Sequence, residues 1–187
     1  MQIEIEKKFN LSENDYKIIK EKCNFIKEVE LKDYYLDKDF ILTKNNYYLR
    51  LRNGVYELKI SSFNHKTKLV KSEEYDNENI INEKIKKFNI STENVEWIIF
   101  VNTKRQKFNY EFKWYNINVD VEEYQYGTRY ELELISDESE EKLNKIIEDF
   151  IKHLWLEAFN DINSSKIITT AMYQNIEMYE ILTKNSI

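Results

Sequence analysis

Residues 47–60 predict a β-hairpin with a fixed register. Two alternating segments flank Asn53-Gly54, and this dipeptide is a strong signal for a two-residue turn because both residues tolerate positive φ angles. The turn would pair three residues before it with three after it: Arg52 with Val55, Arg50 with Glu57, and Tyr48 with Lys59. Opposed residues point to the same side of a sheet. One face of the hairpin is therefore charged and the other is apolar.

The same division into a charged and an apolar face recurs in other segments. Their charged positions are Glu4, Glu6, Lys8, Asp120, Glu131 and Glu133. For one strand alone, the ordinary interpretation is that such charges face water, and we give it a weight of about two in three. Several such strands, with few uncharged polar residues among the charges, favour a barrel with a charged interior.

The complete pattern predicts an α+β fold in one domain, residues 1–187. Strand-like segments lie at residues 2–10, 28–36, 47–53, 55–60, 69–75, 97–107, 109–115, 117–124 and 128–135. Helices are expected after the N-cap Ser12, at residues 77–88 and 139–154, and from about 165 to 182 with Ser164 or Ser165 as its cap. About eight strands at hairpin-like spacing predict a closed, eight-stranded antiparallel β-barrel with helices packed outside. A flat sheet is the alternative.

Composition limits the possible locations and partners. No apolar run approaches the roughly 20 residues that span a bilayer, and the first residues show no signal-peptide pattern. We expect a cytoplasmic protein, without a membrane partner, that is a monomer or a weak homodimer. With 28 basic and 34 acidic residues, the net charge of −6 should repel nucleic acid.

The residue types also limit the chemistry. Two glycines leave no room for a Gly-rich phosphate loop. His65 and His153 share no ligand spacing, and Cys23, the one cysteine, is expected to be buried packing. Clustered carboxylates repel one another unless a cation joins them, and carboxylates without His or Cys favour Mg²⁺ or Mn²⁺ over zinc. Arginine pairs suit bidentate contacts with phosphate.

These residues resemble the CYTH superfamily, also called triphosphate tunnel metalloenzymes. The N-terminal Glu4-x-Glu6-x-Lys8 is similar to the signature of that family, and further segments follow in family order. They are Asp33 to Asp37, Tyr48 to Arg52, Glu57 to Lys59, Thr103 to Arg105, Val119 to Val121, and Glu131 to Glu133. The likeness is greatest to the thiamine-triphosphatase branch and extends to Ser164-Ser165-Lys166. It implies an eight-stranded tunnel that binds a triphosphate with a divalent metal.

The resemblance also implies a role for each matching residue. Those that match metal ligands are Glu4, Glu6, Asp120, Glu131 and Glu133. Those that match phosphate-binding groups are Lys8, Arg50, Arg52, Lys59, Arg105 and Lys166, and Glu4, Glu6, Lys8 and Arg52 are the expected catalytic set. Glu73 falls where related sequences also have a glutamate. Tyr48 stands where animal thiamine triphosphatases have a tryptophan, so it is expected to contact substrate.

The expected activity is metal-dependent hydrolysis of the terminal phosphate of inorganic tripolyphosphate or thiamine triphosphate. Tripolyphosphate is slightly favoured because it needs only charged groups, whereas an organic substrate also needs a fitted binding surface. Four alternatives are a class IV adenylyl cyclase, an RNA 5′-triphosphatase, a non-catalytic polyphosphate- or nucleotide-binding module, and a lipid-binding barrel. The acidic balance argues against RNA, and the charged strand faces argue against lipid.

Overall fold

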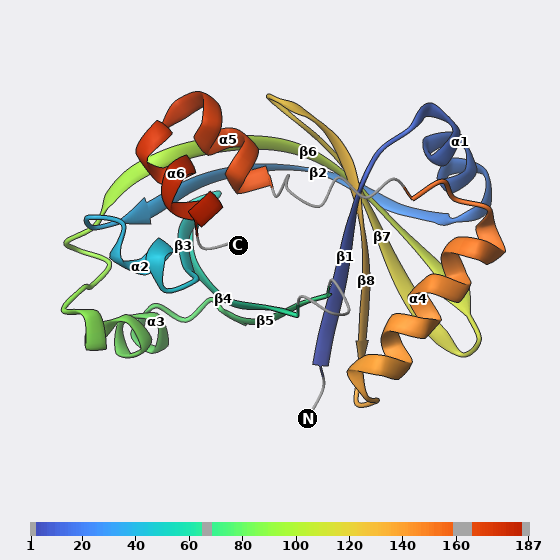
Figure 1. Cartoon of the computed structure of the whole chain (residues 1–187), viewed down its shortest axis with the longest axis horizontal. Coiled ribbons are helices and arrows are strands. Elements are labelled where there is room, and N and C mark those ends of the chain that lie inside the picture. Colours follow the sequence, from blue (N-terminus) through green and yellow to red (C-terminus); the bar gives the residue numbers. More distant parts are fainter. Residues whose placement is uncertain (1–2, 65–68, 159–165, 185–187) are drawn as a thin grey trace. The chain divides into compact units, whose positions relative to one another are not determined.

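The structure, a computed structural model, describes residues 3–64, 69–158 and 166–184; the side chains of residues 3, 4, 63, 64 and 69–71 are not described. Within these ranges, eight strands form an antiparallel sheet (Figure 1). They are β1 (Ile3–Asn10), β2 (Asn24–Asp37), β3 (Tyr47–Arg52), β4 (Val55–Asn64), β5 (Leu69–Tyr75), β6 (Glu96–Phe112), β7 (Tyr115–Tyr124) and β8 (Gly127–Ser136). Their cyclic order is β1-β5-β4-β3-β2-β6-β7-β8, and β1 pairs with both β5 and β8.

The predicted hairpin is confirmed, together with its register. Strands β3 and β4 pair Arg52 with Val55, Arg50 with Glu57, and Tyr48 with Lys59. Asn53 and Gly54 both have positive φ angles, of 49° and 89°. The turn therefore has the backbone conformation that this dipeptide favours.

The structure has one strand where the sequence predicted two, at residues 97–107 and 109–115. Strand β6 continues through Phe108, which pairs with Val119 of β7 and is buried. The turn comes instead at Lys113 and Trp114, whose φ angles are 49° and 71°. Neither residue ordinarily favours positive φ, so the sequence carries no local signal for a turn at this point.

The helices described are α1 (Glu13–Lys22), α2 (Ile41–Lys44), α3 (Glu78–Ile85) with a 3₁₀ turn at Lys86–Phe88, α4 (Glu140–Leu154), α5 (Lys166–Gln174) and α6 (Ile176–Lys184). Ser12 caps α1 as predicted, because its hydroxyl accepts from the Asp15 amide at 3.0 Å. The short α2 was not predicted; Asp37 stabilises it by accepting hydrogen bonds from the amides of Leu42 and Thr43. None of these helices is long and apolar enough to cross a membrane.

The single C-terminal helix predicted to residue 182 is two helices, α5 and α6, separated at Asn175. The Asn175 side chain accepts from the Met178 amide at 3.1 Å and donates to the Ile98 carbonyl at 3.3 Å. The first bond caps the beginning of α6, and the second fixes Asn175 to a residue distant in sequence, so a new helix begins at this point. The predicted caps Ser164 and Ser165 lie outside the described residues.

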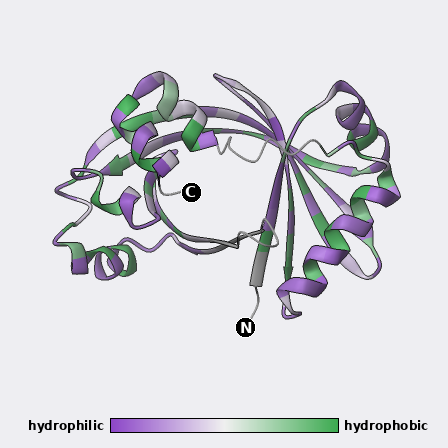
Figure 2. Cartoon of the chain, viewed as in Figure 1, coloured by the Kyte–Doolittle hydropathy of each residue, from purple (hydrophilic) through white to green (hydrophobic). Residues whose placement is uncertain are grey.

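The chain divides into two compact units. Unit 1 comprises residues 1–30, 63–71 and 103–162, and unit 2 comprises residues 31–62, 72–102 and 163–187. In unit 1, α4 packs on β1 and β8, and Figure 2 shows hydrophobic and hydrophilic bands alternating along this helix. Its core includes Ile5, Val119, Leu132, Ile147 and Phe150.

Unit 2 has a separate core, which includes Leu42, Leu49, Leu58, Ile81 and Ile85. Leu49 and Leu58 oppose each other across the β3–β4 hairpin. The apolar side of each unit's strands is thus taken up by its own core. The opposite side carries the charged residues.

Candidate functional site

In unit 1, the strand register places the predicted carboxylates side by side. Glu6 of β1 pairs with Glu133 of β8, and Glu131 of β8 pairs with Asp120 of β7. Glu6, Asp120 and Glu131 are all buried. We call the set Glu6, Asp120, Glu122, Glu131 and Glu133 the carboxylate cluster. Cross-strand neighbours lie about 5 Å apart at Cβ, so these carboxylates share one region of the sheet.

Basic side chains from the same sheet face balance part of this charge. The Lys8 ammonium donates to Glu6 Oε1 at 2.5 Å and lies 3.8 Å from Glu131 Oε1. Arg105 Nη1 lies 2.9 Å from Asp120 Oδ2, and Lys107 Nζ lies 3.7 Å from the same oxygen. The predicted phosphate ligands Lys8 and Arg105 therefore lie directly against predicted metal ligands.

Two members of the carboxylate cluster are harder to ionise than usual. Burial raises the pKa of Asp120, and the charges of Glu131 and Glu122 add to the effect, although Arg105 and Lys107 oppose it. Burial also raises the pKa of Glu133, supported by the charges of Asp120 and Glu6 and opposed by a hydrogen bond from Asn118. The basic neighbours thus leave part of the carboxylate charge unbalanced, and a further cation would stabilise the ionised forms.

The carboxylate cluster has the donor chemistry that a hard divalent cation requires. Its ligands are oxygens on adjacent strands, as Mg²⁺ and Mn²⁺ prefer. In the described part of the chain, no three His, Cys, Asp or Glu side chains are already arranged around a metal position. Glu6, Asp120 and Glu131 instead contact Lys8, Arg105 and Arg129. The Glu4 residue lies on β1 opposite Ile135, but its side chain is outside the described part.

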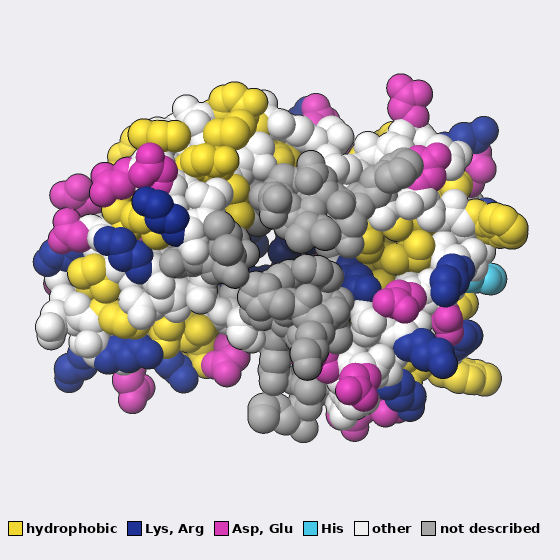
Figure 3. Space-filling model, viewed as in Figure 1, with side chains coloured by type: hydrophobic (Ala, Val, Ile, Leu, Met, Phe, Trp, Pro, Cys, Tyr) yellow, Lys and Arg dark blue, Asp and Glu magenta, His cyan; other side chains and the backbone are white. Residues whose placement is uncertain are grey.

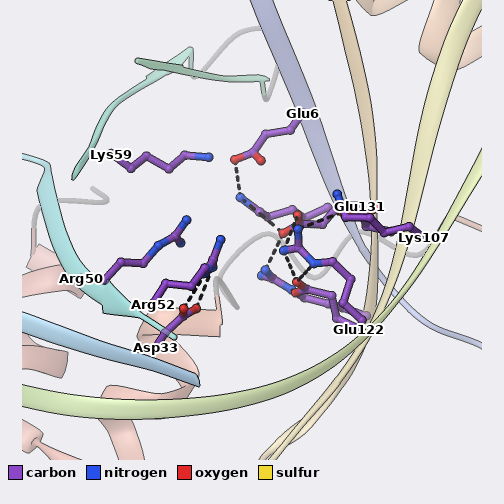
Figure 4. Close-up of polar contacts among 12 residues, drawn as sticks. Glu6, Asp33, Arg50, Arg52, Lys59, Lys107, Glu122 and Glu131 are labelled. Atoms are coloured by element: carbon purple, nitrogen blue, oxygen red, sulfur yellow. Dashed lines mark hydrogen bonds and ion pairs between the residues drawn. The ribbon is translucent and has the colours of Figure 1, made fainter. Parts of the chain in front are cut away.

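In unit 2, two predicted phosphate ligands are arginines held by carboxylates. Arg52 donates to both oxygens of Asp33, from Nε at 2.6 Å and from Nη2 at 2.8 Å (Figure 4). Arg50 donates from Nε to Glu57 Oε2 at 2.8 Å. Paired, planar contacts of this kind fix the orientation of a guanidinium group. Both arginines are therefore pre-oriented on the charged face of the hairpin.

Lys166 is buried at the first turn of α5. Its positive charge acts on the Asp33 carboxylate. Burial alone would raise the pKa of Asp33, but the Arg52 hydrogen bond and the charges of Arg50, Arg52 and Lys166 lower it below the usual value. Unit 2 thus brings Arg50, Arg52 and Lys166 around one ionised carboxylate. Such a concentration of positive charge suits a polyanion.

Lys59 and Tyr48 also lie on the charged face of unit 2. Lys59 Nζ lies 3.1 Å from Glu74 Oε1, so Glu74 is the glutamate of β5 that contacts the predicted phosphate ligand. Glu73 is exposed and accepts a hydrogen bond from Tyr75. Burial raises the pKa of Tyr48, so this phenol stays neutral near pH 7.

Two residues of the unit 1 network were missed by the sequence analysis. Glu122, which is fully buried, accepts hydrogen bonds from both Arg105 and Arg129, and Arg129 also donates to Glu131. The sequence pattern could nonetheless have identified both residues. Glu122 is two residues after Asp120, and Arg129 is two before Glu131, so both share the charged face by strand alternation.

His153 and Cys23 lie outside the carboxylate cluster and the arginine pairs. His153 is exposed on α4, and its Nε2 lies 3.1 Å from the Tyr110 hydroxyl. Cys23 is buried in the unit 1 core, and burial raises the pKa of its thiol to about 11. A thiol with so high a pKa is a poor nucleophile at neutral pH. His65 lies outside the described residues.

Comparison with known proteins is consistent with this geometry. The family model described as CYTH domain matches residues 2–165. Among solved structures, a Hippeastrum protein titled a putative adenylyl cyclase with a dominant triphosphatase activity has a TM-score of 0.67 at 15% identity, with 95% of this chain and 99% of that chain covered. The protein PH1819 of Pyrococcus horikoshii has a TM-score of 0.61 at 19% identity, with 94% of this chain and 100% of that chain covered.

A third similar structure is a putative adenylate cyclase of Bacillus halodurans, with a TM-score of 0.57 at 18% identity, covering 89% of this chain and 96% of that chain. At these identities the structures establish a shared fold. A search among curated proteins finds no match.

Proposed function

Because the chain belongs to the CYTH domain family, we propose that it is a divalent-metal-dependent triphosphatase that removes the terminal phosphate of a small triphosphate. The proposed substrate is inorganic tripolyphosphate or thiamine triphosphate. The observation that carries the proposal is the carboxylate cluster of unit 1, in which all members but the half-buried Glu133 are buried and burial raises the pKa of Asp120 and Glu133. Carboxylates brought close together repel one another, and a bound divalent cation would stabilise their ionised forms.

The proposal includes a closed barrel with its charged face inward, which the cyclic strand order supports. In this proposal Arg50, Arg52, Lys59 and Lys166 bind phosphate oxygens, while Lys8 and Arg105 join the phosphate to the carboxylate cluster. Guanidinium groups already held by Asp33 and Glu57 lose little conformational freedom when a phosphate binds. The positive charges are aimed at oxygens whose negative charge increases as the terminal bond breaks.

Glu4, Glu6, Asp120, Glu131 and Glu133 would hold the cation. Bound Mg²⁺ or Mn²⁺ supplies charge neutralisation of phosphate oxygens and lowers the pKa of water. The protein's own groups orient the reactants: Glu6 or Glu4 accepts a hydrogen bond, and then a proton, from the attacking water. Lys8 lies 2.5 Å from Glu6 Oε1 and holds that carboxylate in place.

A duplex nucleic acid is a poor partner for this protein. On the face drawn in Figure 3, lysine and arginine side chains alternate with acidic ones and do not gather in one patch. Together with the net charge of −6, this leaves no extended basic surface on that face for counterion release from a duplex. A compact polyanion needs only a local cluster of cations.

The test is phosphate release from tripolyphosphate, thiamine triphosphate and ATP, with Mg²⁺, with Mn²⁺ and with EDTA. Glu6→Gln and Arg52→Gln should each lower kcat/KM by about 100-fold or more, as expected for groups that act on the transition state. Lys104→Gln is the matched control, because Lys104 is exposed and adjacent to Arg105 on β6. It should leave activity unchanged.

The products distinguish the competing functions. Metal-dependent release of phosphate supports the triphosphatase. Pyrophosphate with cyclic AMP from ATP would instead identify a cyclase, the activity for which two of the similar proteins are named. Tight binding of tripolyphosphate with no turnover under any metal would identify a binding module, and the proposed activity would then be wrong.

A further inference from the structure

We propose that Glu122 and Arg129 are positioning residues, which hold Arg105 for the phosphate and Glu131 for the cation. The inference rests on the proposed function, since it assigns those tasks to Arg105 and Glu131. Neither Glu122 nor Arg129 need contact substrate or metal. Both act through the side chains that they orient.

Glu122 is the centre of the network. One of its oxygens, Oε1, accepts from Arg105 Nε at 2.8 Å and from Arg105 Nη2. The other oxygen, Oε2, accepts from Arg129 Nε at 2.8 Å. The strand register brings the three together, because Glu122 of β7 pairs with Arg105 of β6 on one side and with Arg129 of β8 on the other. A single carboxylate thus orients two guanidinium groups (Figure 4).

Arg129 extends the network to the carboxylate cluster. Its Nη2 donates to Glu131 Oε1, while its Nε remains bonded to Glu122. Within the described residues, Nη1 is buried and has no hydrogen-bond partner. Burial alone would lower the pKa of Arg129, but the charges of Glu131 and Glu122 raise it, so this side chain stays charged. The unsatisfied Nη1 donor of Arg129 is a cost to folding.

Glu122 and Arg129 are both less exposed than Arg105. The side chain of Glu122 has none of its surface exposed and that of Arg129 has 8% exposed, whereas the side chain of Arg105 is 14% exposed. Arg105 also reaches Asp120 through Nη1, at 2.9 Å. Arg105 therefore contacts one predicted metal ligand, Asp120, directly, and is connected through Glu122 and Arg129 to a second one, Glu131.

Charge and position predict opposite results when either residue is neutralised. Glu122→Gln removes a negative charge beside Arg105, so charge alone predicts tighter binding of a polyanion. Loss of orientation predicts weaker binding. Arg129→Gln removes a positive charge beside Glu131, so charge alone predicts tighter binding of a divalent cation. Loss of orientation again predicts weaker binding. Whether each variant binds its ligand more tightly or more weakly therefore distinguishes the explanation by charge from the explanation by orientation.

The experiment measures binding without turnover. Tripolyphosphate binding is measured by calorimetry in EDTA, and Mn²⁺ binding is measured by electron paramagnetic resonance without phosphate. We expect Glu122→Gln to weaken tripolyphosphate binding at least 10-fold, and Arg129→Gln to weaken Mn²⁺ binding by about 10- to 100-fold, the range typical for residues that orient metal ligands. Equal or tighter binding in these variants would overturn the inference.

A spectroscopic measurement reports orientation directly. The Nε–H signal of Arg105, assigned from its loss in Arg105→Lys, should be protected from solvent exchange in the wild type. It should broaden or exchange rapidly in Glu122→Gln. An Arg105 signal that is unchanged in this variant would exclude Glu122 as its positioning partner, whether or not any ligand binds.

Two further variants provide controls. Glu122→Asp keeps the charge but shortens the side chain by one methylene, so it should fold and still weaken tripolyphosphate binding. Glu123→Gln removes the same charge from the next residue, which is exposed, and should change neither binding constant. If Glu123→Gln weakens binding as much as Glu122→Gln, then the loss is not specific to the position of Glu122 and the inference fails.

Failure of the inference and failure of the proposed function give different results. A wild-type protein that hydrolyses triphosphate, with Glu122→Gln binding as tightly as before, retains the function and loses the inference. A wild-type protein that binds tripolyphosphate without turnover, with the expected losses in both variants, retains the positioning residues and loses the hydrolase. Absence of tripolyphosphate binding in the wild type would overturn both.

Discussion

At the scale of single residues, the predicted phosphate ligands are held by carboxylates. Arg52 is bonded to Asp33, Arg50 to Glu57, Lys59 to Glu74, and Arg105 to Asp120 and Glu122. Each acidic partner reduces the positive charge available to a polyanion and fixes the orientation of the basic side chain. The arrangement thus gives well-oriented basic groups at the expense of net positive charge, as expected where binding must select one geometry of phosphate.

Asp33→Asn tests this balance at the best-defined pair. The substitution leaves Arg52 without its bidentate acceptor, and we expect the free energy of unfolding to fall by about 3 kcal/mol at neutral pH. Because the folded-state pKa of Asp33 is lowered, its stabilisation is fully present above the unfolded pKa near 4. It is lost as the pH falls through the lower, folded-state pKa.

Urea unfolding of the wild type and of Asp33→Asn from pH 2 to pH 7 measures this effect. The difference between the two proteins should be constant from pH 5 to pH 7 and should decrease below about pH 4. A difference that is independent of pH across the whole range would show that the Asp33 charge does not stabilise the fold.

At the scale of elements, helix α5 is tied to strand β6 by a side chain that imitates a neighbouring strand. Gln174 accepts from the Phe100 amide at 2.9 Å and donates to the Phe100 carbonyl at 2.8 Å. Asn175 adds a bond to the Ile98 carbonyl. These bonds satisfy backbone groups of β6 on the N-terminal side of Thr103, the residue at which β6 begins to pair with β7. They also fix the helix that begins with Lys166.

Gln174→Ala should therefore weaken both the strand and the helix. We expect a loss of about 1 to 2 kcal/mol in the free energy of unfolding, since two hydrogen bonds are removed. The Phe100 amide should exchange its hydrogen faster. Gln174→Glu is the matched variant: it can still accept from the Phe100 amide but cannot donate to the carbonyl, so only the first bond remains. Unchanged exchange at Phe100 in Gln174→Ala would contradict this assignment.

At the scale of the whole molecule, the two compact units share their strands. Among the strands described, β2, β4, β5 and β6 each pass from one unit into the other, with the boundaries after Glu30, Ser62, Lys71 and Asn102. Each unit nevertheless has its own core. These four strands therefore connect the two units covalently.

We therefore predict one cooperative unfolding transition, as expected of the single domain inferred from the sequence. Hydrogen exchange in increasing urea measures it, with Val119 reporting on the unit 1 core and Leu49 on the unit 2 core. Their exchange should come to depend on urea with the same slope and the same limiting free energy. Two distinct limiting free energies of exchange would show that the units unfold separately and that the single-domain prediction is wrong.

The sequence alone determined features that depend on local rules. Asn53-Gly54 set the register of β3 and β4 because a two-residue turn permits one pairing. Alternation assigned Arg50, Arg52, Glu6 and Glu131 to the charged faces because side chains on a strand point alternately to its two sides. Ser12 marked the start of α1 because a hydroxyl at that position satisfies an amide of the first turn.

Only the tertiary structure decided which charges meet. Glu6 lies opposite Glu133, and Glu122 joins Arg105 to Arg129, because strands distant in sequence pair in registers that no local turn specifies. The same holds for Glu74 as the partner of Lys59, for the turn at Lys113-Trp114, and for the break at Asn175. In each case the deciding contact comes from a distant segment or from a backbone conformation that the residue does not favour by itself.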